Sequence, residues 1–158
     1  MNPTSIDLAR AVREKAIELL RPSLAESVDL ALTFKHAHWN IKGPTFAQLH
    51  ELFDQSAAEM HEHADILAER IAQLGGTAEG TLAGVARHTG LPPYPEQGGR
   101  APQHLRALTI AVAAFAKNVR RRIDEASRLG DAGTADIFTQ ISRAADKRLW
   151  FIESHLRP

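Results

Sequence analysis

The segment KHAHWNIKGPTFAQLHELFDQSAAEMHEHADILAER spans residues 35–69 and combines helically spaced apolar residues with a set of histidines and carboxylates. After Pro44, no glycine or proline interrupts the chain as far as Leu74. The apolar residues of this interval recur near helical spacing, which predicts one long helix. They are Phe46, Leu49, Leu52, Phe53, Met60, Ile66, Leu67 and Ile71.

Several metal-ligating residue types face one way on this predicted helix. At about 100° per residue, Asp54, Asp65 and Glu69 lie roughly 40°, 60° and 100° around the helix axis from His50. His38 lies near the end of the preceding helix, before the helix break predicted at residues 40–44, and can fold back toward the start of the next helix. Nitrogen with several carboxylates, in a chain without cysteine, favours iron or manganese over structural zinc, although zinc can compete.

The predicted ligands are too far apart along one helix to bind one ion. His50 and Asp65 are separated by about 22 Å at roughly 1.5 Å per residue, about ten times a metal–ligand bond. The i,i+4 pairs are His50 with Asp54 and Asp65 with Glu69. Two copies of the helix can pack antiparallel about a two-fold axis near residues 59 and 60. The first pair of each copy then meets the second pair of its partner. The spacing therefore predicts a site shared between two copies of the chain.

Each of these residues also has a simpler explanation when it is taken alone. A histidine on an apolar helix face is more often a core or interface residue than a ligand, and carboxylates at i,i+4 spacing are usually solvated. The whole set favours a metal, because carboxylates that repel one another on one face need a cation or solvent to compensate them. His36, His61 and His63 lie outside the pattern, and we expect them to be surface or interface residues.

At these residues the chain resembles the Dps family, the mini-ferritins named DNA-binding proteins from starved cells. The phrases KHAHWNIKGPTFAQLHELFD, DILAERIAQLGG and TADIFTQISRAADKRLWFIE occur in the family's order, and the similarity spans roughly residues 24–153. The resemblance implies an all-α, ferritin-like four-helix bundle with a short extra helix in the crossover connection between helices two and three. It also implies a hollow twelve-subunit shell that oxidises ferrous iron at centres shared across two-fold dimers.

The resemblance assigns roles to particular residues. By motif, the ferroxidase ligands are His38, His50, Asp54, Asp65 and Glu69. Trp39, an oxidisable ring beside the first ligand, and Lys35, one helical turn before it, are expected next to the centre, although Lys35 can also be read as a solvated or salt-bridged lysine. Acidic residues near the start of the fourth helix are expected to line pores at the three-fold axes, with Asp136 the best match and Asp131 a second candidate. Helix capping alone would also explain an aspartate there.

The rest of the chain also reads as helix and completes a single domain over residues 1–158. The remaining helices are expected at about Ile6 to His38, Glu79 to Ala86, Gln103 to Leu129 and Gly133 to His155. Pro22 should kink or divide the first of them. The sequence LPPYPEQGGRAP, residues 91–102, is too rich in proline and glycine for regular structure and is predicted to be the crossover connection.

Composition and the start of the chain favour the cytoplasm, and the resemblance implies the cytoplasm or nucleoid of a bacterium. No apolar run approaches the roughly 20 residues that span a membrane, and the start MNPTSIDLARAVREK lacks the apolar stretch of a signal peptide. Absence of cysteine excludes disulfides and thiolate sites.

The resemblance implies a ferroxidase that passes electrons from Fe(II) to hydrogen peroxide or, more slowly, to dioxygen, and stores the Fe(III) mineral, which protects the cell from oxidative damage. The alternative is a nucleoid protein that binds DNA and has little ferroxidase activity. Against direct DNA binding, 19 basic residues balance 19 acidic ones and neither end carries a lysine-rich tail. The run of arginines at 120–122 is followed by Asp124 and Glu125, as on a solvated face.

Two other kinds of metal site fit the sequence poorly. HELFD and HEHAD are one residue from the His-Glu-x-x-His of zinc peptidases, but the second histidine is missing. A conventional ferritin centre inside one bundle needs Glu-x-x-His pairs, and the chain contains none. The sequence therefore favours a site between subunits.

Overall fold

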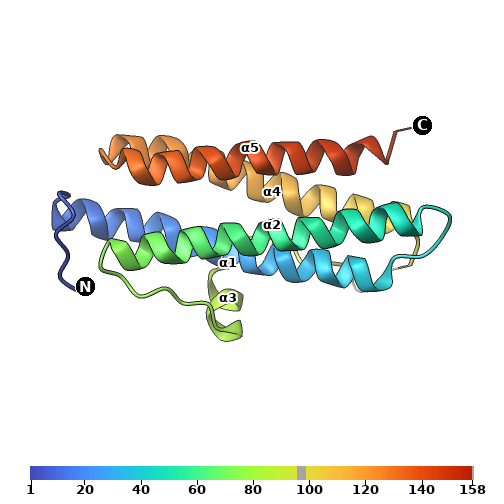
Figure 1. Ribbon diagram of the computed structural model, residues 1–158, viewed down its shortest axis with the longest axis horizontal. Helices are drawn as coiled ribbons and strands as arrows, with labels where there is room; N and C mark the ends of the chain where they lie inside the picture. The colour runs from blue at the N-terminus through green and yellow to red at the C-terminus, as the bar shows by residue number, and fades with distance from the viewer. Residues whose placement is uncertain (96–98, 158) are drawn as a thin grey trace.

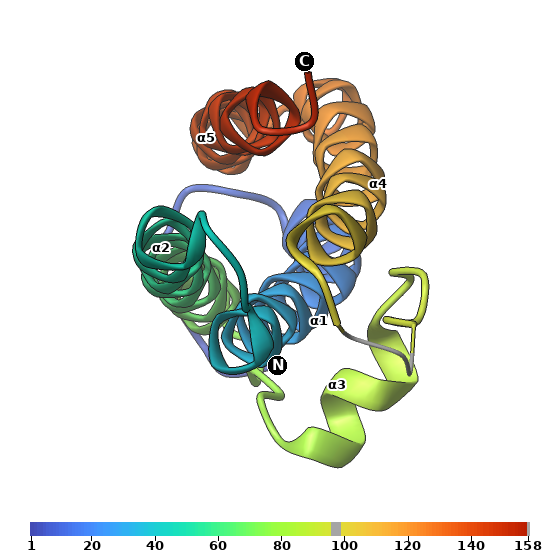
Figure 2. The same ribbon diagram turned by 90° about the vertical axis from the view of Figure 1, so that its right-hand side faces the viewer.

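Five helices make up a computed structural model that describes residues 1–95 and 99–157 (Figure 1). They are α1 (Arg10–Asn40), α2 (Phe46–Gln73), α3 (Leu82–His88), α4 (Ala101–Arg128) and α5 (Ala132–Ser154). The end-on view places the four long helices at the corners of a bundle, with short α3 outside it beside α1 (Figure 2). The predicted all-α bundle with a short helix in the crossover connection is therefore confirmed.

The core runs through the middle of the bundle and takes one fully buried phenylalanine from each long helix. These residues are Phe34, Phe53, Phe115 and Phe138. Each lies on the apolar stripe that its helix turns inward, and burying such a ring stabilises the fold by about 1.5–3 kcal/mol. Among the described residues, none of the helices combines the length and the apolar character needed to cross a membrane.

Helix α1 continues through Pro22 without interruption, so the expectation that this proline divides the first helix is wrong. Proline removes the hydrogen bond to the carbonyl four residues earlier. That carbonyl belongs to Glu18, an exposed residue, where water can replace the missing bond. Buried residues from Ala16 to Ala37 pack α1 against the core on both sides of the proline, which keeps the helix in one piece.

Some predicted helix ends differ from those in the structure. The first helix begins at Arg10 rather than at Ile6. The short helix begins after Thr81, whose hydroxyl oxygen accepts a hydrogen bond from the Gly84 N–H at 3.2 Å. Residues 101 and 102, which we assign to the crossover connection, form the first turn of α4, where a proline lacks only an N–H that has no helical partner. Residues 96–98 of that predicted loop lie outside the described residues.

The turn between α4 and α5 is built by a glycine followed by an aspartate. Gly130 has φ +79°, and the N–H of Asp131 donates to the carbonyl of Ala126 at 3.2 Å, which closes the end of α4. The Asp131 carboxylate then caps α5 by accepting from the Thr134 N–H at 3.0 Å. It also accepts from the Arg70 guanidinium at 2.8 Å. The start of α5 is thereby tied to the end of α2.

A buried ion pair joins α1 to α4 between their apolar layers. The Arg122 guanidinium donates to a Glu26 carboxylate oxygen at 2.6 Å and to the Ser23 hydroxyl at 2.9 Å. The Asn118 side-chain amide donates to the other Glu26 oxygen at 2.9 Å. The charges are therefore paired and hydrogen-bonded, as buried charges must be.

Candidate functional site

The end of α1 meets the start of α2 through two stacked histidines. The rings of His38 and His50 lie 3.6 Å apart between centroids at an interplanar angle of 23°. Nδ1 of His38 is 2.8 Å from the backbone oxygen of His50, and Nδ1 of His50 is 3.0 Å from the backbone oxygen of His38. The ring of Phe46 covers His50 at 4.8 Å between centroids. Each histidine is thus held in place by the backbone of the other.

These two hydrogen bonds assign the tautomer of both rings. A carbonyl oxygen only accepts, so each Nδ1 carries the proton and donates it. In the neutral form of either ring, the lone pair is then on Nε2, the atom that can bind a metal ion. Fixing a histidine ligand through its other nitrogen is the usual way in which proteins orient such a ligand. The fold therefore fixes both rings in the orientation that a metal ligand would need.

The Asp54 carboxylate stands one helical turn after His50 and forms an ion pair with Lys35 of α1. Nζ of Lys35 lies 2.5 Å from Oδ1 of Asp54. The hydrogen bond from Lys35 is the main cause that lowers the pKa of Asp54, and the two nearby histidines also lower it. Asp54 is consequently ionised at neutral pH. Trp39 lies beside this group with 67% of its surface exposed, and Nζ of Lys35 lies 6.0 Å from the centroid of its ring.

The other two predicted ligands lie further along α2. Asp65 and Glu69 are both exposed, one helical turn apart. Within the part of the chain that the structure describes, no three metal-ligating side chains come together. One subunit thus brings the rings of His38 and His50 together near the start of α2, with Asp54 one turn further on, and leaves Asp65 and Glu69 further along the helix. The site shared between two subunits stays a prediction. In each subunit, the histidines and Asp54 lie near the start of α2, and Asp65 and Glu69 lie toward its end.

The two predicted pore residues have different surroundings. Asp131 is 2% exposed, and its carboxylate is occupied by the cap of α5 and by Arg70. The capping alternative therefore describes its position, and we leave it out of the pore proposed below. Asp136 lies just over one turn into α5 and is exposed, as a pore-lining residue must be.

Comparison with known proteins identifies the family of the chain. The protein family described as "Ferritin-like domain" matches residues 17–158. A protein from Agrobacterium fabrum, named DNA protection during starvation protein, is 44% identical over 154 residues, which is 98% of this chain and 95% of that protein. The chain belongs to the Dps family. A protein of the same name from Mycolicibacterium smegmatis is 32% identical over 139 residues, 88% of this chain and 75% of that protein.

Solved structures of Dps proteins superimpose closely on this Dps-family chain. DpsC from Streptomyces coelicolor gives a TM-score of 0.95 at 30% identity, covering 99% of this chain and 92% of that one. The tetragonal form of Mycobacterium smegmatis Dps gives a TM-score of 0.94 at 29% identity, and the match covers 99% of this chain and 96% of that one. The predicted ferritin-like fold of the Dps type is therefore confirmed.

The three histidines outside the pattern are not all alike. His36 and His61 are exposed, as expected. His63 is buried between α2 and its neighbours, so its assignment to the surface or to an interface between subunits is wrong. Burial lowers the pKa of His63, which keeps the ring neutral. Its position on the inner side of α2 explains why it does not join the exposed carboxylates.

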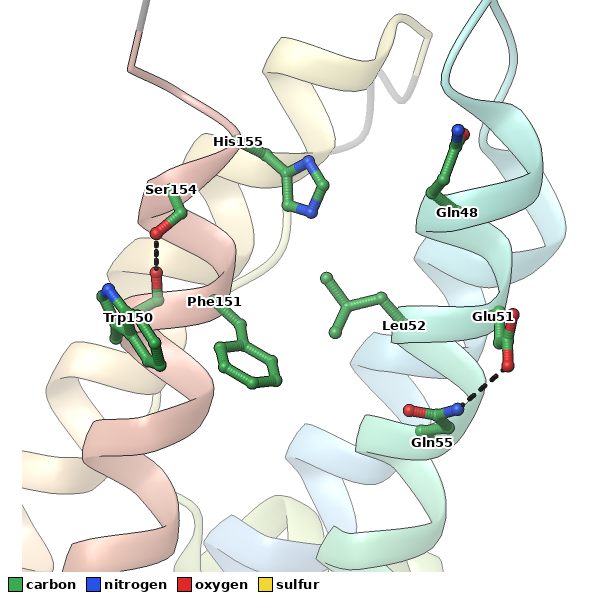
Figure 3. A pocket seen from close by; sticks show the side chains of 8 residues that line it. All are labelled: Gln48, Glu51, Leu52, Gln55, Trp150, Phe151, Ser154 and His155. Carbon is green, nitrogen blue, oxygen red and sulfur yellow. Dashed lines mark hydrogen bonds between the residues drawn. The ribbon is translucent and has the colours of Figure 1, made fainter.

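A hollow of about 410 Å³ lies between α2 and α5, away from the predicted ligands (Figure 3). Leu52 and Phe151 face each other across it, and Trp150 lies along one wall. Its lining carboxylate, Glu51, accepts a hydrogen bond from the amide of Gln55 at 3.1 Å. The hollow is mainly apolar and contains none of the five predicted ligands, so it is not the metal site.

Sequence reasoning missed how the ligands are oriented. The reciprocal bonds of His38 and His50 depend on the close approach of two helix ends, and only the spacing of the two histidines on either side of the Gly43-Pro44 turn hints at it. It also missed a contact between Tyr94 and His104, because their importance depends on where the crossover connection runs.

Proposed function

We propose that this Dps-family chain is a ferroxidase and iron-storage mini-ferritin. The observation that carries the proposal is the stacked histidine pair, in which both Nδ1 atoms are held by backbone oxygens and both Nε2 atoms are left to bind metal, one helical turn from the ionised carboxylate of Asp54. Two neutral imidazoles and a carboxylate form an open ligand set that suits ferrous iron, with zinc or manganese as competitors. Further carboxylates would complete the centre and favour the ferric product, because its charge is higher.

The missing carboxylates would come from a second copy of the chain. Two α2 helices that pack antiparallel about a two-fold axis bring Asp65 and Glu69 of each copy to the histidine end of the other. The three predicted carboxylate ligands, Asp54, Asp65 and Glu69, lie exposed in the single subunit, as this arrangement requires. Such dimers would assemble further into a hollow shell of twelve subunits that holds the mineral. A bacterial cytoplasm or nucleoid is the proposed location.

The proposed reaction uses iron as substrate and cargo. Two Fe(II) ions give up one electron each to hydrogen peroxide, which takes up two protons and leaves as two waters, while two Fe(III) ions pass to the mineral. Dioxygen is the slower oxidant. Holding the ions together at one centre supplies both electrons to the same peroxide, which limits release of the hydroxyl radical that a single electron would produce.

The direct test is anaerobic oxidation of ferrous iron by the assembled protein with added peroxide, beside a control with dioxygen alone. We expect oxidation well above the protein-free rate and a ferric product that stays in solution, followed by its absorbance. Oxidation at the protein-free rate with both oxidants would reject the proposal.

Lys35 and an incoming metal ion compete for the Asp54 carboxylate in this arrangement. Replacement of Lys35 by methionine is expected to tighten anaerobic ferrous binding by about two- to fivefold, a small effect because the ion pair is partly exposed. Isothermal titration calorimetry measures it, with Lys42→Met, which removes an exposed lysine of the adjacent turn, as the matched control. Weaker binding in Lys35→Met would show that the lysine assists the centre.

Asp136 is proposed to attract ferrous ions into a pore of the shell. The change Asp136→Asn is expected to slow mineralisation a few-fold at low ionic strength, and the difference should shrink as salt screens the charge. Stopped-flow absorbance at limiting iron measures the rate. Glu153→Gln removes the same charge near the other end of α5 and serves as the control. Equal rates for both variants at low salt would remove Asp136 from the entry route.

DNA protection is the second candidate function, because two of the relatives carry that name. If the protein acts by coating DNA, gel retardation at about 150 mM salt should show a complex that weakens steeply as salt rises. A retarded complex together with ferrous oxidation at the protein-free rate would favour this role over the ferroxidase.

A further inference from the structure

A tyrosine and a histidine form a close pair where the crossover connection reaches the start of α4. The hydroxyl of Tyr94 lies 2.5 Å from Nδ1 of His104. The ring of His36, near the end of α1, meets the Tyr94 ring edge-on at 5.0 Å between centroids. Hollows of about 280 Å³ lie on two sides of the tyrosine. The phenol is therefore held by a fixed partner while small molecules can reach its ring.

The pair is set up with a proton donor on one side and a free base on the other. His104 is 1% exposed, and its burial and the neighbouring His36 lower its pKa, so the ring is neutral at pH 7. Burial raises the pKa of Tyr94 to about 12, so the phenol keeps its proton. The Tyr94 hydroxyl therefore donates to Nδ1, and the single N–H proton of the neutral His104 ring is on Nε2.

The backbone of Asn40 also influences the charge of the His104 ring. Its carbonyl favours the charged form of His104 and raises the pKa of that ring, against the larger effect of burial. Nε2 nevertheless has no hydrogen bond of normal geometry. If the ring gained a proton on Nδ1, the Asn40 carbonyl would face a positively charged imidazolium, and its attraction would strengthen. A polar acceptor is thus in place for a transient charge on His104.

We propose that Tyr94 is a one-electron donor to strong oxidants such as the hydroxyl radical, and that His104 accepts its proton in the same step. The phenol loses one electron to the oxidant and its proton to Nδ1, leaving a neutral tyrosyl radical and an imidazolium. The hydroxyl radical gains the electron and becomes hydroxide, which a solvent proton converts to water. A ferrous ion or a thiol in solution then returns the electron, and His104 returns the proton.

The geometry favours this role over a purely structural one. An oxidised phenol that keeps its proton is a strong acid, so electron loss becomes far easier when a base already holds the hydrogen bond. A structural tether between the connection and α4 would need only some acceptor at this position. The arrangement found here instead combines a buried neutral base, a single phenol and open access to its ring.

The test uses no iron, so it stands or falls independently of the ferroxidase. Flash-generated tris(bipyridine)ruthenium(III) oxidises the full-length protein, and electron paramagnetic resonance detects the radical. Because Tyr94 is the only tyrosine, a tyrosyl signal belongs to it. We expect a tyrosyl signal that Tyr94→Phe abolishes. We also expect the rate of its formation to fall at least about tenfold in His104→Gln, which keeps a polar group but lacks a comparable base.

His88→Gln is the matched control, since it removes a histidine of α3 that is exposed and lies away from the tyrosine. A second measurement needs no variant. With His104 as the acceptor, the oxidation rate of the wild-type protein is independent of buffer concentration and falls in heavy water. A rate that rises with buffer concentration, or an unchanged rate in a folded His104→Gln protein, would show that the proton leaves to solvent and would overturn the proposal.

Discussion

Replacement of His50 and Asp54 by alanine is expected to abolish fast ferrous oxidation while leaving the shell assembled. The double change removes one imidazole and one carboxylate from the centre, and it also removes the ring that stacks on His38 and the hydrogen bond from the His50 ring to the His38 backbone oxygen. Loss of a residue that only supports a metal ligand commonly costs 10- to 100-fold, so loss of two ligands should lower the rate by at least about 100-fold. Stopped-flow absorbance with peroxide in excess measures the effect.

The control for this experiment is Gln55→Ala, an exposed change on the same helix outside the ligand stripe. Size-exclusion chromatography and circular dichroism of both proteins confirm that assembly and helix content are kept. The control should oxidise iron at the wild-type rate. If the double variant also keeps that rate in an intact shell, the ligand assignment is wrong.

Replacement of Glu26 by leucine is expected to destabilise the protein by about 3–5 kcal/mol, because it leaves the buried guanidinium of Arg122 without its counter-charge. Ser23 would still accept one hydrogen bond from that group, but a neutral hydroxyl does not compensate a buried charge. Urea unfolding followed by circular dichroism gives the free energy of unfolding. Assembly should be matched between proteins, since a shell contributes its own stability.

A second variant separates the lost pair from the lost volume. When Arg122→Met is added to Glu26→Leu, both charges are gone and two apolar side chains fill the space, so most of the stability should return. Exposed Arg120→Met, which breaks the surface pair with Asp146, is the matched control and should change stability by less than about 1 kcal/mol. A double variant as unstable as Glu26→Leu would show that packing, not charge, governs this site.

The helices and the candidate ligands could be predicted because they depend on periodic spacing. An uninterrupted helical pattern places His50 and Asp54 on one face, and the structure puts both beside the end of α1. Pro22 does not divide its helix, which was one of the two outcomes predicted for it, because packing on both sides of the proline outweighs a single missing hydrogen bond. The start of the short helix was displaced to the residue after Thr81, because a cap depends on one hydrogen bond rather than on a pattern.

Features that depend on contacts between distant segments could not be predicted. The role of Asp131 depends on Arg70, 61 residues away along the chain, reaching the start of α5. The hydrogen bond of Tyr94 with His104 exists because the crossover connection returns to the bundle at that point. A sequence shows which residue types are present, but only the fold shows which of them meet.

The shared centre is tested most directly by mixing two inactive subunits. One carries His50→Ala with Asp54→Ala, and the other carries Asp65→Ala with Glu69→Ala. In a mixed dimer, one centre takes intact ligands from both chains. The other centre lacks the substituted ligands of both chains. Random mixing in equal amounts should therefore restore about a quarter of the wild-type ferroxidase activity, although each subunit alone is inactive. No recovery in shells shown to contain both subunits would contradict a centre formed between two copies of the chain.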